Sequence, residues 1–244
     1  MRKNCVSIGI NYRSIPPAAR FFMCCCMVNI LTAEQIAMLK AIGAQPELTK
    51  VFYLSGGTPL AAFYLHHRYS EDLDFFSETE FDVVALNTFF TKQKPLLGFN
   101  NIDYQTSLNR HLFFLDYKSQ TLKMEFTYFP FPRIEVGYRE FGIDVDSQRD
   151  IAVNKLFTIY QRTKARDYID LYLLCQEGGY TISELVKQAR IKFDWHIDSI
   201  QLGTQFMKSR EASELPRMIK PLAEETWRGF FLEEAKKLRD QVLG

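Results

Sequence analysis

LSGGTPLAAFYLHHRYSEDLDFF, residues 54–76 of the 244-residue chain, predicts a short strand, a Gly-Gly turn, a helix and a second strand. Two glycines before a helix let the backbone pass close to a ligand and aim free N–H groups at it, so a phosphate can bind there without a cationic side chain. We expect Gly56 and Gly57 to bind the phosphates of a nucleotide, with Ser55 and Thr58 adding hydroxyl groups. Taken alone, such a turn is more often only a turn.

The helix after the turn has recognisable boundaries. Thr58 can cap it, Pro59 takes the first helical position, where its missing N–H is harmless, and the helix is predicted to run to His67. We expect His67 to position the loop that presents Ser70 to the nucleotide.

Two aspartates close the segment. Asp72 and Asp74 are separated by one residue, and side chains at positions i and i+2 of a strand point to the same face. Adjacent carboxylates repel each other unless a cation neutralises them, and oxygen ligands of this kind suit magnesium bound together with substrate phosphates. The alternative is the polar edge of a half-buried strand. The turn and the aspartate pair, joined by one short helix, are together more specific than either alone and predict a metal–phosphate site.

A two-metal site normally needs a third carboxylate. Residues 122–128, LKMEFTY, alternate apolar and polar side chains, which leaves Lys123, Glu125 and Thr127 on the face opposite the core. Glu125 is therefore the predicted third ligand. Asp116, on the partner strand of the predicted hairpin, is the second candidate.

A second charged cluster lies in residues 150–174. If one helix runs through this segment, Lys155, Arg162 and Arg166 share a face and form a basic stripe able to reach a triphosphate. If the chain breaks at residues 163–165, Asp167 caps the next helix and only Lys155 and Arg162 share a face. The remaining alternative is a solvated charged face with no ligand.

The order of the predicted elements indicates an α+β protein with two lobes and a cleft between them. Strands and helices alternate in residues 27–149, whereas residues 150–244 are helical. Residues 1–26 are predicted to be an extension outside the fold, because a capped helix begins soon after Met27. Predicted helices cover residues 32–42, 83–92, 151–162 and 167–176, with two or three more in 182–243, and predicted strands cover residues 50–54, 72–76, 102–106, 111–117 and 122–128.

Composition excludes several classes of protein. The formal net charge of +1 gives no global sign of a nucleic-acid partner, so any polyanion site must be local. The five cysteines are odd in number and show no paired metal-ligand spacing, which argues against a disulfide framework and fits the reducing cytoplasm. There is no apolar stretch long enough to span a membrane, no P-loop motif and no HExxH motif.

The three motifs together resemble the AbiEii/AbiGii toxin family of nucleotidyltransferases, within the DNA polymerase β-like superfamily. The similar segments are YLSGGTPLA from Tyr53, HRYSEDLDFF from His67, and Lys155 together with residues 162–172. The resemblance implies a mixed-sheet nucleotidyltransferase lobe followed by a helical lobe. By the same resemblance, Lys155 contacts the triphosphate and Asp170 lies in the Arg-Asp-x-x-Asp-Leu segment of the nucleotide site.

The resemblance also implies magnesium, a nucleoside triphosphate, a cognate antitoxin and, as in some relatives, the 3′ end of tRNA as acceptor. In the expected mechanism a hydroxyl attacks the α-phosphate, with Asp72, Asp74, Glu125 and Lys155 as the catalytic residues. Two alternatives stay open: a nucleotidyltransferase that modifies a small molecule of the aminoglycoside type, and a protein that binds nucleotides without catalysis. A small cationic acceptor needs an acidic pocket, whereas RNA needs a basic surface, for which residues 164, 166, 187, 190 and 192 are the candidates.

Overall fold

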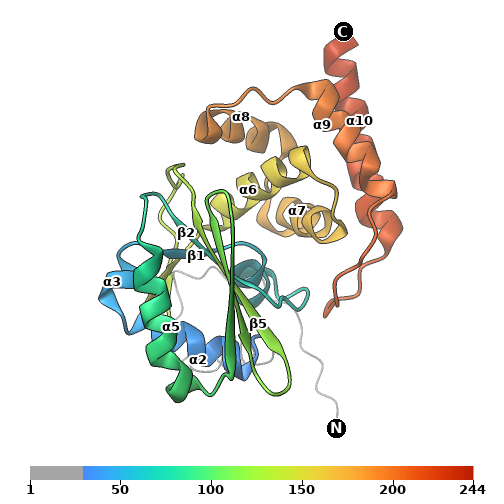
Figure 1. The fold of residues 1–244 in the computed structure, drawn as a ribbon. Helices are drawn as coiled ribbons and strands as arrows, with labels where there is room; N and C mark the ends of the chain where they lie inside the picture. Colours follow the sequence, from blue (N-terminus) through green and yellow to red (C-terminus); the bar gives the residue numbers. More distant parts are fainter. Residues whose placement is uncertain (1–29, 244) are drawn as a thin grey trace, which may run out of the picture.

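A mixed sheet and a group of helices form two lobes in residues 30–243, the part of the chain that this computed structural model describes (Figure 1). The α+β class, with a sheet lobe first and a helical lobe second, is confirmed. The predicted extension over residues 1–26 lies outside the described residues.

The sheet is built from seven strands within the described residues, in the order β3-β4-β5-β2-β1-β7-β6. Strands β1 and β7, and strands β2 and β5, pair parallel, whereas the other neighbours pair antiparallel. The strands are β1 (Tyr53–Ser55), β2 (Leu73–Ser77), β3 (Asn101–Ser107), β4 (Arg110–Asp116), β5 (Thr121–Tyr128), β6 (Arg139–Glu140) and β7 (Ile143–Val145). The last two were not predicted, because strands of two and three residues are too short to show an alternation.

The helices of the sheet lobe begin at caps that the sequence contains. Thr32 and Gln35 form the predicted capping box at the start of α2 (Ala33–Gly43), and Asp82 caps α5 (Val83–Leu97). Helix α5 runs past its predicted end and stops at Gly98, which adopts the left-handed conformation. The remaining helical segments of this lobe are α3 (Pro46–Thr49), α4 (Gly57–Pro59) and the π-helix η2 (Leu60–Leu65).

The helical lobe contains α6 (Gln148–Gln161), α7 (Ala165–Gly178), α8 (Ile182–Phe193), α9 (Ser199–Met207), η3 (Lys208–Arg210) and α10 (Glu224–Leu243). Ser147 caps α6, which begins at Gln148, three residues before its predicted start. The chain does break between α6 and α7, but the residue at the N-cap of α7 is Lys164. The alternative in which Asp167 caps α7 is therefore wrong. None of the helices in the described residues is both long and apolar enough to cross a membrane.

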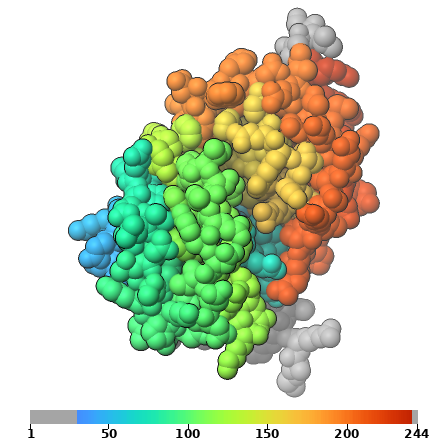
Figure 2. Space-filling model, viewed as in Figure 1, coloured from blue at the N-terminus to red at the C-terminus, as the bar shows by residue number. Residues whose placement is uncertain are grey.

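Each lobe has its own apolar core, and backbone hydrogen bonds join the lobes. The segment before α10 returns to the loop after η2, where the Tyr69 N–H donates to the Arg217 carbonyl and the Ile219 N–H donates to the His67 carbonyl. In Figure 2 the strands of the sheet lobe (green) meet α6 and α7 (yellow) along a continuous boundary. The two backbone hydrogen bonds hold the loop that carries Ser70 against the helical lobe.

Candidate active site

Strand register brings three of the predicted site residues into one row. Ser55 on β1 is paired with Asp74 on β2, and Asp74 is paired in turn with Glu125 on β5. Paired residues on neighbouring strands point to the same face of a sheet. The row therefore faces the helical lobe. The apolar residues of β5, such as Met124 and Phe126, are buried on the other face of the sheet.

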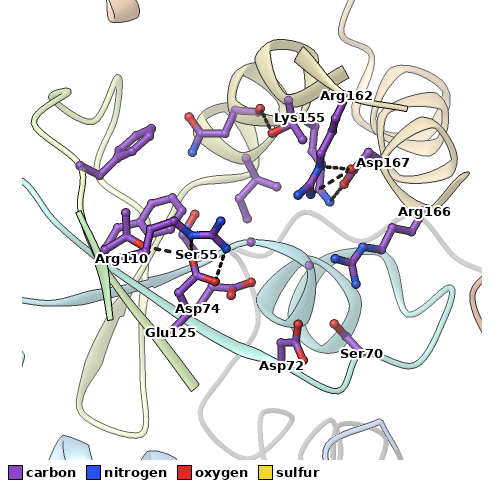
Figure 3. A pocket seen from close by; sticks show the side chains of 18 of the residues that line it. Ser55, Ser70, Asp72, Asp74, Arg110, Glu125, Lys155, Arg162, Arg166 and Asp167 are labelled. Atoms are coloured by element: carbon purple, nitrogen blue, oxygen red, sulfur yellow. Dashed lines mark hydrogen bonds and ion pairs between the residues drawn. The ribbon is translucent and has the colours of Figure 1, made fainter. Parts of the chain in front are cut away.

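A cleft between the lobes contains these residues and most of the others that the sequence predicted (Figure 3). Its sheet side presents an acidic wall, formed by Asp72, Asp74 and Glu125. Its helical side presents a basic wall, formed by Lys155, Arg162 and Arg166. Of the predicted residues, the cleft is lined by Ser55, Gly56, Gly57, Ser70, Asp72, Asp74, Glu125, Lys155 and Arg162, but not by Thr58 or Asp170.

Asp74 is the carboxylate of the acidic wall with the most strongly unfavourable surroundings. Burial, together with the negative charges of Glu125 and Asp72, raises the pKa of Asp74 to about 6. The Asp74 carboxylate also has no hydrogen bond or ion pair to any side chain of the described range. An excess of negative charge with no side-chain partner among the described residues could hold a cation.

The other two carboxylates are held by basic side chains. Lys123 Nζ lies 2.8 Å from Asp72 Oδ2, and Arg110 contacts Glu125 through Nε at 2.5 Å and Nη2 at 2.6 Å. Burial alone would raise the pKa of Glu125, but the hydrogen bonds from Arg110 hold it below its usual value. Arg110 was not predicted as a site residue. Counting residues in both directions from the predicted hairpin turn would have paired it with Thr127, which places it diagonally across from Glu125 on the same face.

The donor set has the chemistry of a magnesium site. Asp74 and Glu125 on adjacent strands, together with Asp72 in the loop just before β2, supply the hard oxygen ligands that magnesium prefers. Within residues 30–243, however, no three His, Cys, Asp or Glu side chains are arranged as they stand to enclose an ion. Two of the three carboxylates of the acidic wall are instead paired with Lys123 and Arg110. Asp116, the second candidate for the third ligand, is hydrogen-bonded to Thr121 on an exposed hairpin and does not line the cleft.

The turn at residues 55–57 has the backbone geometry that only glycine adopts easily. Gly56 has φ of 83° and ψ of −152°, and it stands at the N-cap of α4. A Cβ atom on Gly56 would lie 2.5 Å from Asp74 Oδ2, and one on Gly57 would contact the guanidinium group of Arg68. Thr58 is not the cap of this helix, because its buried hydroxyl group donates to the Asp72 carbonyl instead and so joins the turn to the aspartate loop.

Replacing Gly56 with alanine is expected to lower the affinity for nucleotides by about tenfold and to destabilise the fold. The backbone conformation costs a non-glycine residue about 1–3 kcal/mol, and the added methyl group displaces Asp74. Nucleotide binding and urea unfolding of the variant measure the two effects. Gly98→Ala is the matched control, since Gly98 also has positive φ but no atom within 4 Å of its added Cβ. If the two variants bind nucleotide equally well, Gly56 has no special role in the site.

A buried ion cluster supports the basic wall from behind. Lys155 Nζ lies 2.7 Å from Asp167 and 2.6 Å from Asp170, and Arg68 makes a bidentate contact with Asp170. His67 Nε2 is 2.8 Å from the same Asp170 carboxylate. Burial alone would raise the pKa of Asp170, but the charges of Arg68 and Lys155 hold it well below its usual range. Asp170, which is 0% exposed, is therefore placed to position Lys155 and Arg68, not to contact the nucleotide.

Asp146 supports the turn and was not predicted, because its position just before a helix cap carries no distinctive pattern. Ser55 Oγ lies 2.7 Å from Asp146 Oδ2, and the Oδ1 atom of Asp146 has no hydrogen-bond partner among the described residues. Burial is the main reason that the pKa of Asp146 rises to about 7. The Ser55 hydroxyl group donates this hydrogen bond, so Asp146 fixes the direction of the Ser55 side chain at the turn.

Replacing Asp146 with asparagine is expected to flatten the pH dependence of stability between pH 4 and pH 8. The folded-state pKa is raised, so folding favours the protonated form, and the wild type loses stability as the pH rises from about 4 through 7. Asparagine carries no such charge. Between pH 4 and pH 8 the free energy of unfolding should therefore fall by roughly 1–3 kcal/mol less in the variant than in the wild type. Urea unfolding at several pH values measures this. Asp144→Asn, on the half-exposed face of β7, serves as control.

The five residues expected to form a basic acceptor surface do not all lie together: Lys164 and Arg166 line one hollow beside the cleft, and the other three lie elsewhere. Lys192 is buried against Asp150, and Lys187 and Arg190 line a separate cavity between α8 and α10. Arg166 remains at the cleft and has no ion pair within the described residues. It shares a hollow beside the cleft with Arg217, whose guanidinium group stacks on Tyr69.

One known protein family matches most of the chain. Residues 37–241 match the family described as nucleotidyl transferase AbiEii toxin of type IV toxin–antitoxin systems. An uncharacterised protein of Aquifex aeolicus (strain VF5) is 32% identical over 146 residues, which cover 58% of this chain and 66% of that protein. The matched segment thus spans just under two thirds of that relative.

Two solved structures from Helicobacter pylori share the fold. JHP933 aligns with a TM-score of 0.53 and 21% identity, covering 88% of this chain and 92% of its own. The other, which was proposed to be a nucleotidyltransferase, aligns with a TM-score of 0.54 and 20% identity, covering 88% of this chain and 96% of its own. At these identities the similarity establishes the arrangement of the two lobes.

Proposed function

This chain belongs to the AbiEii family of nucleotidyl transferase toxins, and we propose that it transfers a nucleoside monophosphate from a triphosphate to the 3′ hydroxyl of an RNA. The observation that carries the proposal is the cleft itself, in which a wall of three carboxylates faces a basic wall across the glycine turn. An acidic wall suits the cations that accompany a triphosphate, and a basic wall suits its phosphates.

The residues of the chain divide the work of the reaction. Backbone N–H groups of the turn and the Ser55 hydroxyl, oriented by Asp146, hold the phosphates at the N-terminus of α4. Lys155 and Arg162 neutralise the triphosphate from the opposite wall, where Arg68, Lys155 and Arg162 carry three positive charges against two on Asp167 and Asp170. An acceptor hydroxyl then attacks the α-phosphorus and pyrophosphate leaves.

Asp72, Asp74 and Glu125 are the residues that would hold magnesium. When bound there, magnesium supplies a Lewis acid for the phosphates and favours ionisation of the attacking hydroxyl. The protein's own contribution is to keep Asp74 unpaired and adjacent to the turn, where Asp74 Oδ2 is within contact of Gly56.

An RNA acceptor is supported by Arg166 and Arg217, which line a hollow that shares Ser70 and Asp72 with the cleft. Guanidinium groups beside an aromatic ring suit a phosphate backbone with stacked bases. The small-molecule alternative requires an acidic acceptor pocket, and Glu71 and Glu214 line the same hollow. In keeping with its family, we propose that the chain has a cognate antitoxin and acts in the cytoplasm.

The experiment that tests the proposal incubates the purified chain with each labelled nucleoside triphosphate, magnesium and total RNA, with and without host lysate. We expect the label to appear on RNA, and no labelling when EDTA is present during the incubation. Label on a small molecule from the lysate, with none on RNA, would favour the aminoglycoside-type alternative.

A further inference from the structure

The acidic wall contains its own cation at the position of the third carboxylate. The Arg110 guanidinium group makes a bidentate contact with Glu125, at 2.5 Å and 2.6 Å, and it lines the cleft. We propose that Arg110 is a resident counter-cation, which holds Glu125 in the nucleotide-free site and is displaced from it when a divalent cation binds with the nucleotide. This inference rests on the proposed function, because it assumes that Glu125 is a ligand of that cation.

The two partners differ in their freedom to move. Glu125 projects from the middle of β5 and its side chain is 8% exposed, whereas the Arg110 side chain is 45% exposed at the end of β4. Moving the guanidinium group into water or toward another anion therefore requires little change in the fold. By contrast, the Lys155 side chain is 10% exposed and held between two buried carboxylates. Arg110 can leave its carboxylate, and Lys155 cannot.

Charge explains why the displacement is coupled to the nucleotide. With Asp72, Asp74 and Glu125 ionised and with Arg110 and Lys123 charged, the acidic wall carries one net negative charge. A divalent cation held by the three carboxylates reverses that sign and occupies the place of the guanidinium group at Glu125, so the cation and Arg110 compete for this carboxylate. A triphosphate in the same cleft offers the released guanidinium group phosphate oxygens, which it binds in the same bidentate manner. Cation binding at Glu125 and nucleotide binding should therefore strengthen each other reciprocally.

Titration with Mn²⁺, followed by the electron paramagnetic resonance of the free ion, tests this without measuring activity. In the absence of nucleotide, Arg110→Ala is expected to bind Mn²⁺ at least about tenfold more tightly than the wild type, because a charge-assisted bidentate contact no longer competes. With a non-hydrolysable triphosphate present, the variant is expected to gain less Mn²⁺ affinity from the nucleotide than the wild type gains. Arg110→Gln provides a second variant that removes the charge but keeps a polar side chain.

Two comparisons separate this competition from a general change of charge. Arg139→Ala removes an arginine that is paired with Asp144 outside the cleft, and its Mn²⁺ affinity should stay at the wild-type value. Glu125→Gln combined with Arg110→Ala should abolish the tightening, because the effect acts through Glu125.

The possible outcomes distinguish the inference from the proposed function. If the wild type binds Mn²⁺ and both Arg110 variants bind it equally or more weakly, the counter-cation role is wrong while the metal site stands. If neither the wild type nor the variants bind Mn²⁺, even with the triphosphate, both the inference and the metal-dependent mechanism are overturned.

Discussion

Asp74→Asn is expected to lower nucleotide transfer by at least about 100-fold, which corresponds to a loss on the order of 3 kcal/mol of transition-state stabilisation. Asp74 occupies the centre of the row formed with Ser55 and Glu125, and within residues 30–243 its carboxylate is the one in the acidic wall without a side-chain partner. An amide at this position cannot supply the negative charge that a divalent cation requires. Single-turnover transfer to the labelled RNA measures the effect.

The same substitution should not weaken the fold in metal-free buffer at pH 8. The pKa of Asp74 is raised to about 6 in the folded state, so its carboxylate destabilises the fold increasingly as the pH rises from about 4 through 6. The neutral amide removes that repulsion, and urea unfolding should show equal or greater stability than the wild type. Asp116→Asn, on the exposed hairpin, is the control and should keep both activity and stability. If Asp74→Asn transferred nucleotides at the wild-type rate, Asp74 would not be a catalytic residue.

Asp170→Asn is expected to reduce the free energy of unfolding by about 3–5 kcal/mol, the usual consequence of removing one partner of a buried ion pair. Asp170 is fully buried, and its two oxygens contact His67, Arg68 and Lys155. Without the carboxylate, Arg68 at 3% exposure is left without a counter-ion. Urea unfolding at pH 7 measures the loss. At Asp103, an exposed residue of β3, the same substitution should change stability by less than about 0.5 kcal/mol.

Loss of the Asp170 carboxylate should also weaken nucleotide binding. The Arg68 guanidinium group lies against Gly57. If it moves after losing its contact with Asp170, it disturbs the turn that is proposed to hold the phosphates. We expect the affinity for nucleotide to fall in Asp170→Asn even at temperatures where the variant remains folded. Full stability together with unchanged nucleotide affinity would show that the ion cluster does not position the site.

Local patterns were sufficient to predict most elements and the acidic wall. The capping box at Thr32, the strict alternation in β5 and the i, i+2 spacing of the aspartates are properties of neighbouring residues, which sequence displays directly. The same alternation placed Glu125 on the cleft face. The boundaries were less accurate, since β1 begins at Tyr53 and not at residue 50, and the helix after the turn is a π-helix that ends at Leu65.

By itself, the sequence determined the two-lobed α+β order, the glycine turn and the placing of Asp74 and Glu125 on one face of two strands, because periodicity and capping act over a few residues. Asp72, predicted to open the strand of Asp74, lies instead in the loop before β2. Only the tertiary structure decided which charges meet. The contacts of Arg110 with Glu125 and of Ser55 with Asp146 depend on strand register, and that of Arg68 with Asp170 depends on packing between residues 102 positions apart. Such pairs leave no local pattern, because the energy of each contact depends on distance in the fold and not on distance along the chain.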